Sequence, residues 1–586
     1  MTTVDWLLFA GFLAYVVWDG TRQAKKNHGA DDYFLAGRSM PWWAIGLSIM
    51  ATQASAITMI GTTGKGWSDG LGFVQFYFAL PIAMFILAFT LVPLYHRLRV
   101  STAYEYLGVR FDAKTRIASA AVFVALRSLS LAIVIYAPSV LLTHLIGTDP
   151  QWTIIAMGGI ALVYTTLGGL RAVIATDVKQ MTVMCIGLVV AFVTIALRLP
   201  DDVGLAGAWE LAGAAGRLEW IDLSWDPSRR YTLWSSLLGG TLLFLAYFGC
   251  DQSQAQRLLA SRSVSSARRA LLLNAVAKVP FQFLVLSCGV LLFGFYLFAP
   301  MPVSFVPNAK TAPPAATEQE FQRLVTAHEH ATSTARSLAR DYLAAPEVTR
   351  ATRAEEFRTS LAEAEEIRST AKELRDWPKN SDHAFPYFIL TYFPMGLAGI
   401  LLAAIFAAAL SSIDSELNAV STVLVLDVLQ VPKRYNDDAR TLQVARRTTA
   451  VVGIAATAIA LFLGGRDSVI DAVNLVGSYF YGSLLGVFVL AVAMPRANGT
   501  GAVAGLFSGV LAIALAHGWT WYNESELGFL YFNTISTTAT IIVGATVSVF
   551  TAGSPPGPEV SESGELGSGR SESGRSQSGE PDTESA

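Results

Sequence analysis

The chain has 586 residues, of which 53% are hydrophobic and 15% are charged, whereas soluble domains carry about 25% charged residues. The mean hydropathy of +0.45 excludes an ordinary soluble protein. The formal net charge of -3, with the basic residues divided among short loops, gives no face for binding nucleic acid. We therefore expect an all-α integral membrane protein.

Apolar runs of about 20 residues, the length that a helix needs to cross the hydrocarbon core, recur along most of the chain. They predict about thirteen transmembrane helices, near residues 4–20, 43–64, 72–95, 117–146, 152–170, 177–199, 232–250, 271–299, 385–413, 447–464, 469–494, 500–518 and 529–551.

Basic residues fall on alternate loops between these runs. They are Arg22, Lys25, Lys26 and Arg38; Arg97, Arg99, Arg110, Lys114 and Arg116; Arg257, Arg262, Arg268 and Arg269; and Lys433, Arg434, Arg440, Arg446 and Arg447. The positive-inside rule assigns these loops to the cytoplasm. We predict a multi-pass protein of the cell membrane with its N terminus outside and its C terminus in the cytoplasm.

Two segments lack the apolar pattern. Residues 308–380 are rich in Ala, Glu and Arg, with apolar residues at helical spacing, which predicts a helical hairpin outside the membrane. The tail from Gly553 to Ala586 consists largely of Gly, Ser, Glu and Pro and is expected to be disordered.

The stretch ATQASAITMIGTTGKG, residues 51–66, places polar residues where the chain should cross the membrane. Small residues there are explained by close helix packing. Gln53 needs a further reason, because a buried amide without partners costs about 2 to 7 kcal/mol. An opening of the helix at this point would expose the carbonyl oxygens of Ala51 and Ala54.

A second polar stretch, AAALSSIDSELNAVSTVLVLD, covers residues 407–427. Ser411 and Ser412 share a helix face with the backbone of Ala408, one turn earlier. Packed against the opening in the first stretch, this face would form a site made only of oxygen ligands, which suits a hard cation such as sodium. The alternative is that the serines bond back to carbonyls of the preceding turn.

Ionisable residues inside transmembrane segments are costly and indicate function. Asp177 begins one predicted span and Lys278 lies inside another, although Lys278 is also compatible with reaching the cytoplasmic interface. Asp251 lies closer to a loop, which leaves an interfacial role open. We expect Asp414 and Glu416 to face cytoplasmic water.

Four tracts, in this order along the chain, resemble the sodium/solute symporter family, which contains sodium-coupled glucose, iodide, monocarboxylate, multivitamin, proline and sialic acid transporters. They are ATQASAITMIG, YTTLGGLRAVIATDVKQ, YFGCDQSQAQR and ALSSIDSELNAVST. The resemblance runs from about Asp5 to Phe550. It implies a leucine-transporter-type fold, with two inverted repeats of five helices and with core helices broken at mid-membrane.

The resemblance also implies site residues. The family's sodium ligands match Ala51, Ala54, Ala408, Ser411 and Ser412, and some members bind a second sodium near an aspartate that matches Asp177. Compared with the sugar transporters, Gln53 replaces Asn, Thr58 replaces His, Val74 replaces Glu and Asn474 replaces Gln, while Lys278 and Tyr247 are retained. The candidate solute-binding residues are Gln53, Thr58, Gln75, Tyr247, Lys278 and Asn474.

On this basis the chain divides into residues 1–42 (first helix and cytoplasmic loop), 43–299 and 384–495 (two parts of the transporter core), 300–383 (extracytoplasmic insertion), 496–551 (C-terminal helices) and 552–586 (cytoplasmic tail). The expected function is sodium-coupled import of a small polar or anionic solute, with sodium as the coupling ion and with no other cofactor. No HExxH, GxSxG or paired-His motif indicates an enzyme. Proton coupling through Asp177 and a transporter-like sensor are the alternatives.

Overall fold

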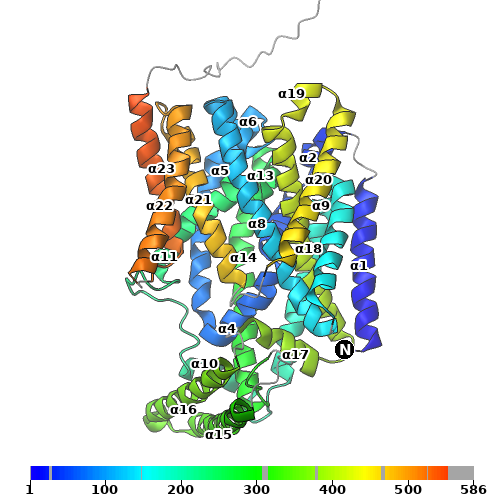
Figure 1. Cartoon of the computed structure of the whole chain (residues 1–586). Coiled ribbons are helices and arrows are strands. Elements are labelled where there is room, and N and C mark those ends of the chain that lie inside the picture. Colours follow the sequence, from blue (N-terminus) through cyan, green and yellow to red (C-terminus); the bar gives the residue numbers. More distant parts are fainter. Residues whose placement is uncertain are drawn as a thin grey trace, which may run out of the picture.

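The computed structural model describes residues 2–24, 29–146, 148–305, 315–375, 381–463, 469–523 and 526–551. Within these ranges the chain is helical, with one isolated bridge between Met40 and Ser261. Most helices run side by side along one direction (Figure 1). The predicted disordered tail lies outside the described residues.

The longer helices build this bundle. Their bounds are α1 Thr3–Ala24, α3 Trp42–Gln53, α5 Ala79–Phe89, α8 Ala113–Ile146, α9 Pro150–Leu197, α14 Val264–Phe298, α18 Leu397–Val423, α20 Asp438–Leu461, α21 Val469–Ala493, α22 Gly499–Tyr522 and α23 Leu530–Phe550. The helices α15 Ala315–Ala344 and α16 Glu347–Leu374 are equally long but polar.

Short helices connect the long ones. They are α2 Ala30–Leu35, η1 Ala36–Arg38, η2 Thr58–Thr62, α4 Thr63–Asp69, η3 Gly70–Phe78, α6 Leu91–Leu98, α7 Ala103–Arg110, α10 Gly204–Ala214, α11 Leu233–Ser235, η4 Ser236–Gly240, α12 Thr241–Leu245, η5 Ala246–Cys250, α13 Gln252–Leu259, η6 Ser381–His383, α17 Ala384–Tyr392, η7 Leu424–Val428 and α19 Val431–Tyr435.

The outside of the bundle is apolar, as a lipid environment requires. Leu7, Val276 and Leu515 expose 68%, 72% and 66% of their surface. Soluble monomers rarely expose many large apolar side chains together. Ten helical runs of the described chain are long and apolar enough to cross a membrane.

The prediction of thirteen spans differs from these ten for identifiable reasons. The 48-residue α9 covers two predicted spans, and Gly169, with φ of 57°, interrupts it near the end of the first. Residues Thr58–Leu98 form one continuous apolar run where two spans were predicted to meet, and the described apolar part of α21 is the shorter run Gly477–Ala493. The number thirteen and the inverted five-helix repeats stay predictions.

One predicted span needs correction. Residues 385–413 were expected to form a single helix, but α17 ends at Tyr392 and α18 begins at Leu397. Between them lie Pro394, which disfavours helical geometry in the residue before it, and Gly396, with φ of 86°. The apolar run is continuous in sequence and divided in structure.

Two further helices are interrupted inside the bundle. The helix α3 ends at Gln53, and Ala54 has φ of -89° and ψ of 66°. The helix thus opens at Ala54 and Ser55, at the end of the predicted opening, and Ala51 is still helical. Helical structure resumes at Ala56 and continues into η2, a π-helix. Downstream, Asp251 has extended backbone between η5 and α13 and caps α13 by accepting from the Ser253 amide.

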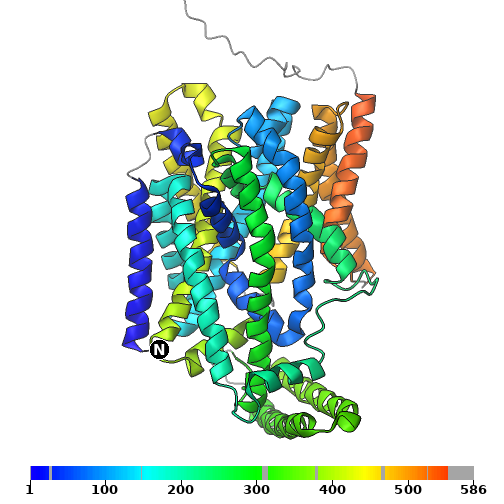
Figure 2. The ribbon, with the colours of Figure 1, turned by 180° about the vertical axis from the view of Figure 1, so that it is seen from behind.

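The predicted hairpin is present, because α15 and α16 pack against each other. Figure 1 shows it at the end of the bundle where the N terminus lies, whereas α23 ends at the opposite end. From behind, the green helix α14 runs the length of the bundle down to the hairpin (Figure 2).

The four basic loops gather at the end opposite the hairpin. The Arg38 guanidinium donates to the carbonyl oxygens of Arg99 and Val100, which joins the first two loops. Arg262 donates to the Ser39 carbonyl, and the Ala30 amide donates to the Asp438 carboxylate, which joins the other two. The alternation of charge in the sequence thus corresponds to one face of the molecule.

Candidate ion and solute site

The open end of α3 touches the middle of α18. The Ser412 hydroxyl shares its hydrogen between the Thr52 carbonyl oxygen, at 3.0 Å, and the Ala408 carbonyl oxygen, at 3.3 Å. The second contact is the bond to the preceding turn that the alternative interpretation expects, and the first is the contact across to α3. All the predicted sodium ligands are buried: Ala51, Ala54, Ala408, Ser411 and Ser412.

The other serine of the pair points toward α9. The Ser411 hydroxyl donates to Asp177 Oδ1 at 2.6 Å, and the Ser48 hydroxyl donates to Oδ2 at 2.5 Å. Arg257 Nη2 lies 3.0 Å from the same Oδ2, and both partners of this ion pair are buried. Asp177 therefore joins the predicted sodium ligands to a buried arginine.

The sequence-based assignment of Arg257 to a cytoplasmic loop is wrong. Its side chain is 1% exposed, and besides Asp177 it contacts the Ser253 carbonyl and the Ser415 hydroxyl. The reason is the break at Asp251, which turns α13 back into the bundle so that Arg257 faces inward.

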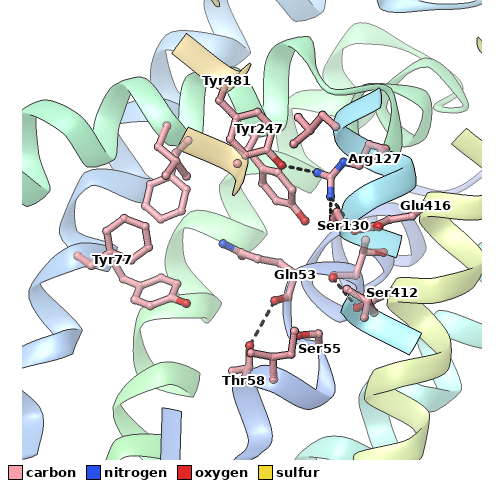
Figure 3. Close-up of a pocket in the computed structure, with 18 of the residues that line it drawn as sticks. Gln53, Ser55, Thr58, Tyr77, Arg127, Ser130, Tyr247, Ser412, Glu416 and Tyr481 are labelled. Carbon is pink, nitrogen blue, oxygen red and sulfur yellow. Dashed lines mark hydrogen bonds and ion pairs between the residues drawn. The ribbon is translucent and has the colours of Figure 1, made fainter. Parts of the chain in front are cut away.

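A cavity of about 120 Å³ adjoins the contact between α3 and α18. Three of the predicted solute-binding residues, Gln53, Thr58 and Tyr247, line it together with Ser412. Figure 3 shows the Gln53 side chain in the space between Tyr77 on one side and Arg127 and Glu416 on the other. The Gln53 Oε1 atom is buried without a hydrogen-bond partner.

Gln75 and Lys278, two further predicted solute-binding residues, do not line this cavity. Gln75 holds a loop instead, because its amide donates to the Tyr231 carbonyl and accepts from the Asp222 amide. The Lys278 ammonium is buried without a hydrogen-bond partner, 5.8 Å from the centre of the Tyr77 ring. The Asn474 side chain lies outside the described residues.

The structure adds a charged cluster that the sequence analysis missed. Arg127, in the middle of α8, lines the cavity and is 3% exposed. Its Nε donates to Asp251 at 2.6 Å, its Nη1 to Glu416 at 2.6 Å and to Ser130 at 3.5 Å, and its Nη2 to the Tyr481 hydroxyl at 2.6 Å. These contacts link α8, α18 and α21 around the cavity (Figure 3), and through Asp251 they reach the start of α13.

Two predictions about acidic residues are therefore wrong. Glu416 faces the cavity and Arg127 instead of cytoplasmic water, and Asp414 is fully buried, with the Tyr164 hydroxyl donating to its Oδ2 at 2.9 Å. The helix α18 continues to Val423, ten residues beyond the predicted end at 413, so both positions lie inside the protein. Asp251 is likewise buried and not interfacial.

The surroundings of Ser412 and the cavity differ in the chemical groups that they offer. Around Ser412 the available ligands are carbonyl and hydroxyl oxygens, which suit a hard monovalent cation, and no cluster of three His, Cys, Asp or Glu residues suited to a metal ion occurs in the described chain. The cavity combines buried charge, unsatisfied amide and carboxylate oxygens, and aromatic rings, as solute sites do.

A family model and several known proteins match most of the chain. The model of the sodium:solute symporter family matches residues 33–330 and 370–509. The sodium/sialic acid symporter SiaT of Proteus mirabilis is 26% identical over 553 residues, which cover 92% of this chain and 94% of SiaT. The human sodium/iodide cotransporter is 27% identical over 520 residues, covering 87% of this chain and 68% of the cotransporter.

A solved structure shares the fold. The substrate-bound, outward-open form of a Na⁺-coupled sialic acid symporter superposes with a TM-score of 0.73 at 24% sequence identity, over 95% of this chain and 99% of that one. The arrangement of helices described above is thus one already found in a membrane transporter.

Proposed function

Because the chain belongs to the sodium:solute symporter family, we propose that it is a sodium-coupled symporter that imports a small polar or anionic solute by alternating access. The observation that carries the proposal is the contact between the open end of α3 and the serine pair of α18, next to a buried cavity. The family consists of transporters, which accords with a protein that is not an enzyme.

Sodium binds, in this proposal, among oxygens of Ala51, Ala54, Ala408, Ser411 and Ser412. An ion there would tie the open end of α3 to α18 and so fix the half of the cavity wall formed by Gln53 and Thr58. Asp177 is the candidate ligand for a second sodium, because it accepts from the Ser411 hydroxyl. Sodium and solute then stabilise each other's binding by the same factor, as linkage requires.

Transport would proceed from outside to inside. Sodium enters down its gradient and favours the outward-open state, the solute occupies the cavity, and closure around both leads to release into the cytoplasm. The face that carries the four basic loops is cytoplasmic by the positive-inside rule, which puts the N terminus and the α15–α16 hairpin outside. We retain the division into a core of residues 43–299 and 384–495 with an insertion at 300–383.

Uptake into proteoliposomes tests the proposal. The purified full-length chain is reconstituted and offered labelled solutes of three kinds: neutral polyols, carboxylates and ammonium compounds. We expect accumulation of one kind under an inward sodium gradient, with no accumulation under a potassium gradient and no effect of a protonophore.

The matched variants locate the ion site. Ser411→Ala combined with Ser412→Ala should abolish the sodium-dependent uptake. Ser287→Ala, which removes a buried hydroxyl bonded only to its own helix at Phe283, should not. Uptake driven by a proton gradient without sodium would replace the proposal with proton coupling, and failure of every solute kind under sodium would contradict transport itself.

A further inference from the structure

The Arg127 guanidinium at the cavity pairs with more than one carboxylate. Every N–H group of the Arg127 guanidinium already has an acceptor within the protein: Asp251 for Nε and Nη2, Glu416 and Ser130 for Nη1, and the Tyr481 hydroxyl for Nη2. One guanidinium thus faces two carboxylates. Of these charged groups, Arg127 and Glu416 line the cavity and Asp251 does not, so Glu416 shares the charge of Arg127 with a second carboxylate and is only partly compensated.

One carboxylate oxygen of this cluster has no donor. Asp251 uses both of its oxygens, because Oδ2 accepts from Arg127 and Oδ1 accepts from the amide and hydroxyl of Ser253. Glu416 uses only Oε1, which accepts from Arg127 and from Ser130. Its Oε2 is buried without a partner, although the residue is 5% exposed and lines the cavity.

An unpaired carboxylate oxygen in such a place requires a donor. A buried charged acceptor that stays unsatisfied costs more than an ordinary buried polar atom. Water and an alcohol can donate to it, but a cationic donor also compensates the remaining charge of the carboxylate, and the gain is larger away from bulk water. The Lys278 ammonium is not this donor, because it lies beside the Tyr77 and Phe281 rings and does not line the cavity.

Aromatic side chains form a large part of the cavity wall. Six rings line the cavity, those of Phe73, Phe76, Tyr77, Phe244, Tyr247 and Tyr481. Several of them contact one another, with ring centres 4.7 Å apart for Phe76 and Phe244 and 6.0 Å apart for Tyr247 and Tyr481. The Arg127 guanidinium lies over the Tyr247 and Tyr481 rings, 5.3 and 5.7 Å from their centres, and the Lys278 ammonium lies 5.8 Å from the centre of the Tyr77 ring. The rings of Phe73, Phe76 and Phe244 are therefore the ones left for a solute. A carboxylate beside such aromatic faces is the combination that binds ammonium and methylated ammonium groups.

We propose that the transported solute carries a positively charged ammonium group, which binds in the cavity between Glu416 Oε2 and the aromatic wall. This inference rests on the proposed function and narrows its small polar or anionic solute to compounds with an ammonium nitrogen, which excludes purely anionic solutes. A zwitterionic solute meets this requirement, because its own carboxylate leaves the charge of the ammonium group in place.

Isosteric pairs separate charge from shape. Glycine betaine and 3,3-dimethylbutyrate differ only in a charged nitrogen against a neutral carbon, as do choline and 3,3-dimethylbutan-1-ol. The thermal stability of the purified full-length protein is measured with each compound, in sodium and in potassium buffer, since a bound ligand raises stability by mass action. The pair β-alanine and butyrate extends the test to a primary ammonium group.

We expect one of the ammonium compounds to stabilise the protein in sodium, and its partner without the ammonium group to need about tenfold more ligand or to fail. Glu416→Gln keeps an oxygen for Arg127 and removes the charge. It should therefore lower the affinity for the ammonium compound by about tenfold or more and leave stabilisation by sodium alone unchanged.

The matched control is Asp427→Asn. Asp427 is also a buried carboxylate paired with an arginine, Arg116, at 2.7 Å, and also has an unpartnered oxygen, but it does not line the cavity. It should leave the preference for the ammonium compound intact. If Glu416→Gln does not fold, the comparison of isosteres in the unaltered chain decides alone.

Equal stabilisation by the paired compounds, stabilisation only by the anionic or neutral members, or no effect of any ammonium compound would overturn the inference. Sodium-dependent stabilisation by an anionic or neutral compound would still support sodium-coupled transport. Absence of sodium-dependent stabilisation together with absence of uptake for every solute kind would contradict the proposed function as well.

Discussion

Single residues inside the bundle carry most of the functional argument. Polar groups within apolar runs indicated Ser412 and Asp177 from the sequence alone, and the structure brings both to the contact between α3, α9 and α18. Arg127 was missed although it sits in the middle of a predicted span, where the rule that selected Lys278 applies equally. Glu416 was predicted to face water because it follows an apolar run, and the local sequence does not show that other helices cover this end of α18.

The ion pair of Asp177 and Arg257 provides a prediction for stability. Asp177→Asn leaves a buried guanidinium without its carboxylate, and breaking such a pair costs about 3 to 5 kcal/mol. We expect this loss in the unfolding free energy of the purified protein. Combining it with Arg257→Gln should recover part of the loss, because no unpaired charge then remains.

Additive losses in the double variant would contradict this account, since residues that interact directly show non-additive effects. The exposed pair of Arg353 and Glu356 on α16 serves as the control. Arg353→Gln should change stability by less than about 1 kcal/mol, as is usual for surface ion pairs.

At the level of helices, apolar runs predicted most elements, and the helical spacing in residues 308–380 predicted the hairpin. The helix boundaries were less predictable. The division between α17 and α18 depends on Pro394 and Gly396 inside an otherwise apolar run, and Gly169 interrupts α9 in the same way. Such breaks depend on a few backbone angles, whereas the apolar pattern continues through them.

The hairpin has a titratable group in its interior. His328 of α15 is 1% exposed, and its Nδ1 lies 3.2 Å from the Ala364 carbonyl of α16. Burial lowers the pKa of His328 below the ordinary value of 6.5. The neutral ring therefore contributes stability that is present above that value and is lost as the pH falls below it, because the unfolded hairpin binds the proton more readily.

Hydrogen exchange of residues 315–375 should accordingly become faster between about pH 7 and about pH 5, after correction for the intrinsic exchange rate. His328→Gln should remove most of this pH dependence. His330→Gln, which changes the exposed histidine two positions further along, should keep it. A pH dependence that survives in His328→Gln would assign it to other groups.

For the whole molecule, charge alternation in the sequence predicted which loops share a face, and the contacts of Arg38 and Arg262 confirm the grouping. Which face is cytoplasmic remains a prediction from the positive-inside rule. The interior could not be predicted to the same degree, because the cavity joins residues from α3, η3, α8, α12, α18 and α21 that lie far apart in the sequence.

Cysteine labelling tests the orientation. Val348 on the hairpin is 93% exposed, and Tyr435 at the end of α19 is 40% exposed, on opposite ends of the molecule. We expect a membrane-impermeant maleimide to label Val348→Cys on intact cells and Tyr435→Cys only after permeabilisation, above the background of the unaltered chain. The reverse pattern would invert the topology.

The account as a whole depends on a sodium ion bound between α3 and α18. The most direct measurement is equilibrium binding of radioactive sodium to the purified protein, with unlabelled sodium and potassium as competitors. The account predicts saturable binding that sodium displaces and potassium does not, that Ser411→Ala with Ser412→Ala abolishes, and that Ser287→Ala retains. Saturable binding that persists in the double serine variant, or no saturable binding in the unaltered protein, would contradict it.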